Sequence, residues 1–325
     1  MTTSLTDTAV KVAISALDSE AATPIEKIEM LLEMATRLQQ KPSDGHPLTQ
    51  AIVLYDHALD KCGDTYPLLK ARTLVGKATA LRSLPEEGPE RLLEAKELYE
   101  TALPILTQQG SSEERAETQM NLGLVMQSLV PYHRARLADC IYLYQQALEV
   151  FNVKNHPQEY AILQNNIAIA YLSMTSSTGR DDLKQAIAVQ TFEQALQSIT
   201  LIDHPSEYAM LQNNLGNALQ YLPSTHPVDN NLRALTAYDE ALKVRTAQDT
   251  PLAYAHTLAN RANVLVNLPD DLEKPEGGNQ QHLEQAAAHY QEVEQIFSTY
   301  GQFSQAQSVR QAREALSQAI AEVVG

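Results

Sequence analysis

A pattern that recurs along the chain limits its possible folds more than any other feature. Its form is a small residue, an aromatic residue four positions later and, three positions after that, an alanine, which is replaced by valine in the last occurrence. Self-similarity at a period of about 20 to 50 residues indicates a repeat architecture. The six occurrences are Ala51, Tyr55 and Ala58; Ala95, Tyr99 and Ala102; Cys140, Tyr144 and Ala147; Ala188, Phe192 and Ala195; Ala234, Tyr238 and Ala241; and Ala286, Tyr290 and Val293.

A second marker precedes each occurrence and predicts where helices begin. A proline or serine stands 11 residues before a glycine or alanine, as in Pro157 to Ala168 and Pro205 to Gly216. Proline is favoured in the first turn of a helix, because no hydrogen bond is lost there. Each unit is therefore predicted to contain two helices. The small residue lets the second helix approach closely, and the aromatic is expected to pack into the next pair.

Two units are so alike that they point to a known family. The sequence HPQEYA at 156–161 precedes NNIA at 165–168, and HPSEYA at 204–209 precedes NNLG at 213–216. Together with the two markers, this form resembles the tetratricopeptide repeat. It is most similar to the longer repeats of kinesin light chains and of bacterial arrays attached to caspase-like CHAT domains. The usual repeat has about 34 residues, so these units are longer.

The resemblance implies an all-α fold, namely a right-handed α-solenoid of about six helix pairs with a capping helix at each end. Such arrays need caps, because the terminal pairs otherwise expose an apolar face. A chain of 325 residues also suits an array better than one compact core. The expected segments are a cap at 1–23, pairs at 24–62, 67–108, 112–153, 157–202, 205–247 and 251–298, and a second cap at 299–325.

The charge of the chain disfavours two classes of partner. The formal net charge is −16, from 24 Lys and Arg against 40 Asp and Glu. Such a surface repels nucleic-acid phosphates and anionic membranes, so neither partner is expected. The sequence has no long apolar stretch, and its start is unlike a signal peptide. We expect a cytoplasmic protein.

Motifs for catalysis or for cofactor binding do not occur in the sequence. Cys62 and Cys140 are the only cysteines and lack the spacing of a zinc site or a redox pair. There is no HExxH motif, and Gly76-Lys77 lacks the remainder of a phosphate-binding loop. We expect no enzyme activity, catalytic residue, cofactor or metal, and small-molecule ligands are disfavoured.

Asparagines recur on the first helices, where the resemblance implies a concave binding surface. Asparagine is a poor helix former, so its repetition suggests a use. Its amide can donate to and accept from the backbone of an extended peptide. The expected groove residues are Arg72, Asn121, Asn165, Asn166, Asn213, Asn214, Asn217, Asn260 and Asn263.

The same asparagines have a second interpretation, in which they bond between adjacent first helices and only fix the packing of the array. The two roles are compatible. The resemblance favours a scaffold or adaptor that holds a segment or helix of a client protein. A peptide-sensing regulator and a self-associating structural subunit are the alternatives. The sequence does not identify the partner.

Overall fold

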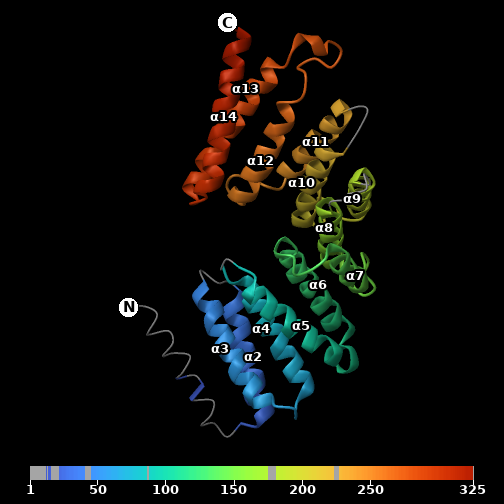
Figure 1. Ribbon diagram of the computed structural model, residues 1–325, viewed down its shortest axis with the longest axis vertical. Coiled ribbons are helices and arrows are strands. Elements are labelled where there is room, and N and C mark those ends of the chain that lie inside the picture. The colour runs from blue at the N-terminus through green and yellow to red at the C-terminus, as the bar shows by residue number, and fades with distance from the viewer. Residues whose placement is uncertain are drawn as a thin grey trace. The chain divides into compact units, whose positions relative to one another are not determined.

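The chain folds into helices that belong to two compact units. The computed structural model describes residues 12, 14–15, 22–40, 45–85, 88–174, 181–222 and 227–324, and these ranges contain helices and no strand. The units are Met1–Phe151 and Asn152–Gly325 (Figure 1). The fold is thus all-α and of the solenoid type, as the repeat pattern predicts.

Unit 1 consists of helices that pack in chain order. They are α2 (Pro24–Gln40), α3 (Gly45–Cys62), α4 (Pro67–Ser83), α5 (Glu90–Gln109), α6 (Ser112–Leu129) and α7 (Leu137–Leu148), with a short 3₁₀ helix, η1 (Val130–Tyr132), before α7. Each helix contacts the next, and the first helix of a pair also contacts the first helix of the following pair, as α2 does with α4 and α4 with α6. Every pair therefore covers its neighbour.

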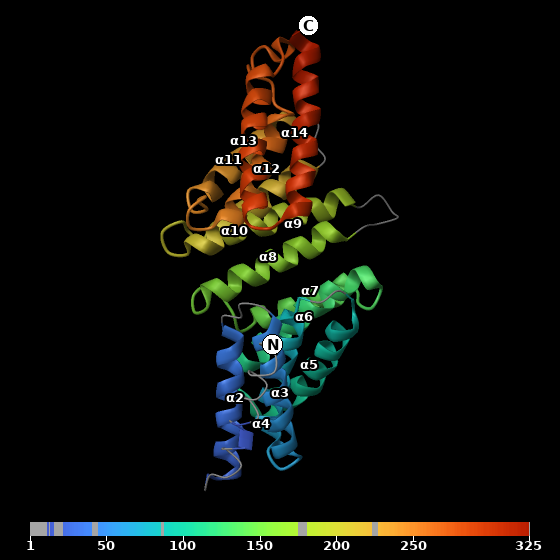
Figure 2. The same ribbon diagram turned by 90° about the vertical axis from the view of Figure 1, so that its left-hand side faces the viewer.

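Unit 2 repeats this arrangement and ends on an additional helix. Its helices are α8 (Pro157–Ser173), α9 (Asp181–Leu196), α10 (Pro205–Tyr221), α11 (Pro227–Leu242), α12 (Pro251–Leu265), η2 (Pro275–Gly277), α13 (Gln280–Thr299) and α14 (Phe303–Val324). Here too the first helices α8, α10 and α12 contact one another in sequence. Helices α13 and α14 lie side by side at the end of the unit (Figure 2).

The starts of the first helices follow from local chemistry. Proline opens α4, α8, α10 and α12, where its missing N–H costs no hydrogen bond. Helix α6 lacks this proline and has a capping box instead: the Ser111 side chain accepts from the Glu114 N–H, and the Glu114 side chain accepts from the Ser111 N–H. Both solutions satisfy backbone groups that a helix end leaves unpaired.

The aromatic residue of each second helix is buried against the small residue of a first helix. Tyr144 has no exposed surface, and a Cβ placed on Gly123 would lie 2.5 Å from its ring. Tyr238 and Gly216 repeat this contact, with a separation of 2.6 Å. Only glycine permits this approach without movement of the ring or of the helix.

The hydroxyl groups of the buried tyrosines form hydrogen bonds to a polar residue of the same helix pair. Tyr144 donates to Gln127 at 2.8 Å, and Tyr238 donates to Asn217 at 2.6 Å. The expectation that the aromatic packs into the next pair holds for the Tyr55 ring, which fills the space above Gly76. That expectation is incomplete, because the tyrosine hydroxyl groups bond within their own pair. Their partners stand one or four residues after the small residue of the first helix.

Phe192 is the exception to this hydroxyl pattern, and its surroundings differ accordingly. The positions one and four residues after Ala168 are Ile169 and Leu172, both of which pack against the cluster that contains Phe192. An aromatic without a hydroxyl is thus matched by two apolar neighbours. The polar residues at these positions in the other pairs are therefore partners of the tyrosine hydroxyl.

The two ends of the chain are described to different extents. Ile14 is buried beside Ile28 and Leu31, but most of residues 1–23 lies outside the described ranges. At the other end α14 buries Ala306 and Leu316 against the last pair. Tyr300 and Phe303 do not share this cover, since they are 51% and 73% exposed on the turn before α14 and at its first residue.

No described helix combines the length and the apolar character that crossing a membrane requires.

Replacing Phe192 with tyrosine is expected to destabilise unit 2. The new hydroxyl would be buried among Ile169 and Leu172 without a partner, at a cost of about 1–3 kcal/mol. Urea denaturation would measure the change. The double variant Phe192→Tyr with Leu172→Gln should recover part of the loss, because glutamine restores the partner that Tyr144 has. Equal stability of the wild type and Phe192→Tyr would contradict the hydroxyl pattern.

Deleting residues 302–325 should uncover the last helix pair. Leu283, Tyr290 and Phe297 would lose the cover that α14 provides. Since an exposed apolar face promotes association, we expect a lower melting temperature and oligomers in light scattering. A monomeric truncated protein that melts at the unchanged temperature would show that α14 is not a cap.

Candidate functional site

A continuous network of side-chain amides joins the first helices of unit 2. Asn214 of α10 donates to the Asn165 oxygen of α8 at 2.7 Å, and Asn213 donates to the Asn214 oxygen at 2.9 Å. Asn260 of α12 reaches the Asn213 oxygen at 3.5 Å. Asn165 in turn donates to Asn166 at 3.3 Å. We call these five residues the asparagine ladder.

The ladder forms because the NN pair occupies the same place in α8 and α10. Adjacent residues on a helix point about 100° apart, so in α10 Asn214 bonds to Asn165 of α8 while Asn213 accepts from Thr257 and Asn260 of α12. An amide has both donors and acceptors, and it can therefore bond on two sides at once. The second interpretation of the asparagines predicts this bonding between helices. The bonds use only part of the hydrogen-bonding capacity of the amides.

Burial divides the predicted groove residues of unit 2 into two groups. Asn165, Asn166 and Asn213 are 6%, 7% and 8% exposed and lie within the packing of the first helices. Asn214, Asn217 and Asn260 are half-buried and Asn263 is exposed. A ligand can reach the second group directly, whereas it could reach the first only if the helices moved apart.

The half-buried and exposed asparagines retain hydrogen-bonding groups. Asn217 and Asn263 accept from the Tyr238 and Tyr290 hydroxyls, and among the described residues no acceptor faces their amide nitrogens. Asn260 uses one donor, at the distance limit of a hydrogen bond, and its oxygen has no donor among the described residues. These amides are therefore fixed in position and only partly satisfied.

In unit 1 the predicted groove residues lie on α4 and α6. The Arg72 guanidinium of α4 bonds to the Glu114 carboxylate of α6, with Nε to Oε1 at 2.6 Å. That pair lowers the pKa of Glu114, chiefly through the hydrogen bond. Asn121 is buried in α6. Arg72 therefore links adjacent first helices as the ladder does in unit 2, and its charge is compensated.

The sequence reasoning missed two residues that extend the ladder, Thr257 and Arg245. The Thr257 hydroxyl donates to the Asn213 oxygen at 3.1 Å, and Arg245 donates to the Thr257 oxygen at 2.8 Å. Burial lowers the pKa of Arg245, although the group stays protonated. A signal was present in the sequence, since Arg245 stands six residues before Pro251, where Ile199 before Pro205 and Phe151 before Pro157 are apolar and buried.

Tyrosines near the starts of the first helices attach them to the second helix of their pair. Tyr208 donates to Glu240 and Tyr254 donates to Glu292, each at 2.9 Å. Burial and the neighbouring Glu292 raise the pKa of Tyr254 to about 12. The phenol thus remains a donor at neutral pH, and these contacts hold the first helices in place.

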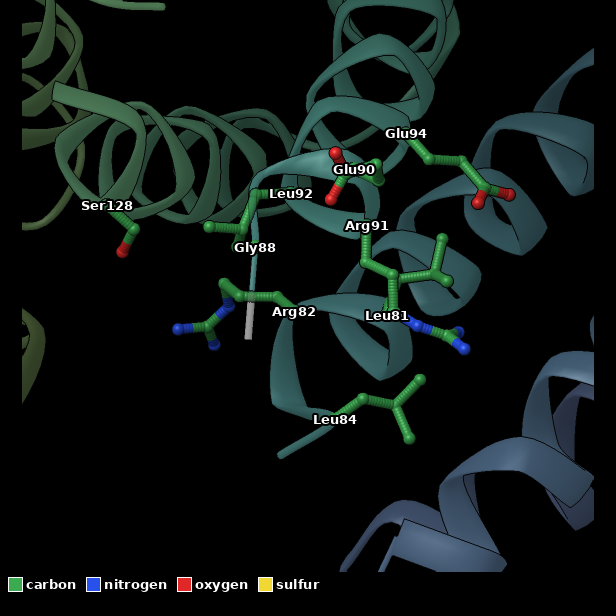
Figure 3. Close-up of a pocket in the computed structure, with 9 residues that line it drawn as sticks. All are labelled: Leu81, Arg82, Leu84, Gly88, Glu90, Arg91, Leu92, Glu94 and Ser128. Carbon is green, nitrogen blue, oxygen red and sulfur yellow. The ribbon is translucent and has the colours of Figure 1, made fainter. Parts of the chain in front are cut away.

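Unit 1 contains a cavity of about 690 Å³ at the turn between α4 and α5, beside the end of α6 (Figure 3). Its lining includes Leu81, Arg82, Arg91 and Ser128. The guanidinium groups of Arg82 and Arg91 point to opposite sides of the site in Figure 3. They therefore do not converge on one ligand.

Among the described residues, no three His, Cys, Asp or Glu side chains gather in a way that could hold a metal ion.

Paired helices, a buried aromatic in each second helix and contacts between successive first helices define a helical repeat protein of the tetratricopeptide type. No protein-family model and no curated protein matches the sequence. The structure is similar to the apo form of the quorum sensor NprR from B. thuringiensis, with 15% identity and a TM-score of 0.55 over 94% of this chain and 92% of that one. It is also similar to BtubC (BKLC) from P. vanneervenii, with 16% identity and a TM-score of 0.51 over 84% of this chain and 92% of that one.

At these identities the likeness shows the fold alone. It confirms the predicted all-α, tetratricopeptide-type architecture.

The variant Asn213→Ala is expected to lower the stability of unit 2 by about 1–3 kcal/mol. It removes the acceptor of Thr257 and Asn260 and the donor to Asn214 inside a buried network. Asn267→Ala is the matched control, because that exposed amide lies in the turn after α12 and, among the described residues, bonds only to the Asn263 carbonyl. Urea melts of both variants should differ clearly, and equal melts would argue against a stabilising ladder.

Proposed function

We propose that the protein is a non-catalytic adaptor that holds an extended segment of a client protein against the first helices of unit 2. The observation that carries this proposal is the group of accessible, partly satisfied amides formed by Asn214, Asn217, Asn260 and Asn263. They are the accessible part of the groove that the sequence predicts. The buried Asn165, Asn166 and Asn213 have a supporting role beneath them.

The spacing of the helices suits an extended chain. Adjacent first helices pack about 8–10 Å apart, and an extended peptide advances about 3.3 Å per residue. An amide on α10 and one on α12 can therefore bond to backbone groups about three residues apart. Such contacts do not depend on the client's side chains, which suits an adaptor with several clients.

The ladder makes these amides more effective as ligands. Asn214 is held on both sides, by Asn165 and by Asn213, so binding costs little additional side-chain entropy. Asn217 is held by the Tyr238 hydroxyl. Bonding between helices and binding of a client are thus two uses of one set of residues.

A peptide-sensing regulator is the alternative function. One similar structure carries the name of a quorum sensor, which agrees with this alternative at the level of fold. The two functions differ in the ligand, since a sensor binds a short free peptide and an adaptor binds a segment of a folded or nascent protein. The predicted groove residues of unit 1, Arg72 and Asn121, do not distinguish the two functions.

The double variant Asn217→Ala with Asn260→Ala should weaken client binding about tenfold, from about 0.5–1.5 kcal/mol for each lost bond. Stability should fall less than in Asn213→Ala, because the Gln220 amide beside Tyr238 can turn over to accept the freed O–H, and alanine is the better helix former. The client would be isolated by affinity capture from the native host, and its binding would be measured by calorimetry beside thermal melts.

Asn267→Ala serves as the control for this experiment and should bind the client as the wild type does. Unchanged affinity in the double variant would refute the role of these amides. Tighter binding of short free peptides than of any captured protein would favour the sensor.

A further inference from the structure

Arg245 occupies a position that is apolar in other helix pairs. It stands four residues after Ala241, and its N–H donates to the Ala241 carbonyl at 3.0 Å. The N–H groups of Ile199 and Phe151 donate in the same way to the alanine four residues before them. Both of these side chains are buried. An apolar side chain therefore meets the packing needs of this position, and the arginine requires a separate explanation.

The hydrogen bond between Arg245 and Thr257 does not supply that explanation. Among the described residues the guanidinium bonds only to Thr257, through Nη1 at 2.8 Å. Thr118 stands at the equivalent place of α6, five residues before the small residue, and is also buried. Its hydroxyl bonds to the Glu114 carbonyl, and Leu106 stands where the last pairs have Arg245 or another large residue. A buried threonine at this place therefore needs no arginine.

The other two nitrogens of the Arg245 guanidinium are accessible to a ligand. Nε and Nη2 have no partner among the described residues. They are also not sealed inside the protein. The buried side-chain nitrogens and oxygens that lack a partner belong to other described residues, namely Arg82, Gln119, Asn166 and Gln185. Two neighbouring N–H groups of Arg245 are thus in contact with solvent and unpaired.

No carboxylate compensates the charge of Arg245 among the described residues. The turns at this end of unit 2 are all described, namely residues 197–204, 243–250 and 300–302. Asp249 belongs to the same turn as Arg245, but its carboxylate accepts from the Thr246 hydroxyl at 2.8 Å. Burial lowers the pKa of Arg245, and no acidic group raises it. The cation is therefore uncompensated, although the chain carries 40 acidic residues.

His256 connects this cation to the accessible asparagines. Its side chain is exposed and packs on Phe297, with ring centroids 4.9 Å apart. Burial and the nearby charge of Arg245 lower the pKa of His256. Positions 256, 260 and 263 follow at intervals of four and three residues, so His256 lies on the same side of α12 as Asn260 and Asn263. It is one helical turn, about 5.4 Å along the axis, from Asn260.

We propose that Arg245 binds the carboxylate of a glutamate or aspartate side chain in the client segment that the asparagines hold. Arg72 uses the same two nitrogens, Nε and Nη2, to hold the Glu114 carboxylate. Two parallel N–H groups fit a planar carboxylate. The proposal rests on the adaptor function and specifies its partner, an extended segment that contains an acidic residue.

The position of Arg245 favours a side chain over the end of a client chain. The accessible amides cross from α10 to α12, whereas His256 is displaced from them along α12 towards its first residue. A segment that follows the amides therefore passes beside Arg245. A group that branches from the client backbone reaches the guanidinium, and the backbone continues past it.

The test is a titration of the full chain, isotope-labelled in arginine, that is followed by NMR of the Nε–H groups. The probe is the acetylated pentapeptide amide Ala-Ala-Glu-Ala-Ala, and glutamine replaces glutamate in its neutral counterpart. We expect a saturable shift of the Arg245 Nε–H signal with the acidic peptide and at least about tenfold weaker binding of the neutral one. An acetylated peptide of alanines with a free C-terminal carboxylate should bind more weakly than the acidic peptide.

Arg245→Leu is the decisive variant, because Leu106 is accommodated at this position in another pair. It should fold as the wild type does and bind the acidic and neutral peptides equally, judged from the backbone amide signals of unit 2. Arg245→Lys keeps the charge without the two parallel N–H groups and should also bind the acidic peptide more weakly. Lys154→Gln is the matched control. It removes one charge from an exposed turn residue of the same unit and should bind as the wild type does.

The outcomes are distinct from those of the adaptor proposal. Equal binding of the acidic and neutral peptides, tighter binding of the free C-terminal carboxylate, or full affinity in Arg245→Leu would overturn the carboxylate site. The absence of any shift at Arg245 would do the same. None of these results affects client binding at the amides. Unchanged client affinity in Asn217→Ala with Asn260→Ala would overturn the role of the amides, whereas the acidic peptide would still report on Arg245.

Discussion

The contact between the aromatic of each second helix and the small residue of a first helix determines how closely the helices of this protein approach. Tyr144 over Gly123 and Tyr238 over Gly216 leave no room for a Cβ. The ring fills the space between helices, and its hydroxyl must then find a partner because it is buried. One or four residues after the small residue there is consequently a polar partner where the aromatic is Tyr144, Tyr238 or Tyr290, whereas both positions are apolar where it is Phe192.

This packing brings the first helices close enough for a second layer of interactions. Once α8, α10 and α12 are adjacent, their asparagines bond to one another and to Thr257. Such a buried polar network stabilises the array only if its members are satisfied together. The members nearest the surface remain partly unsatisfied, and this property makes them suitable for binding a client backbone. The proposed adaptor function therefore assigns stability and recognition to the same row of residues.

Most arginines near helix contacts have a carboxylate partner, as Arg72 and Arg261 do, and these pairs need no ligand to explain them. Arg82 stands four residues after the small residue of its helix, where three other pairs have a glutamine that bonds to a tyrosine hydroxyl.

The sequence by itself determined the helix pairs, their order and many of their starts, because proline, small residues and aromatics act through local geometry and steric fit. It also indicated the row of asparagines. Only the tertiary structure decided which of them are buried, since Asn165 and Asn166 lie within the packing of the first helices whereas Asn217 is only half-buried. Likewise it showed that Phe303 is exposed. Burial and pairing depend on contacts between residues far apart in the chain, and a repeat pattern fixes the spacing of such residues without fixing what surrounds them.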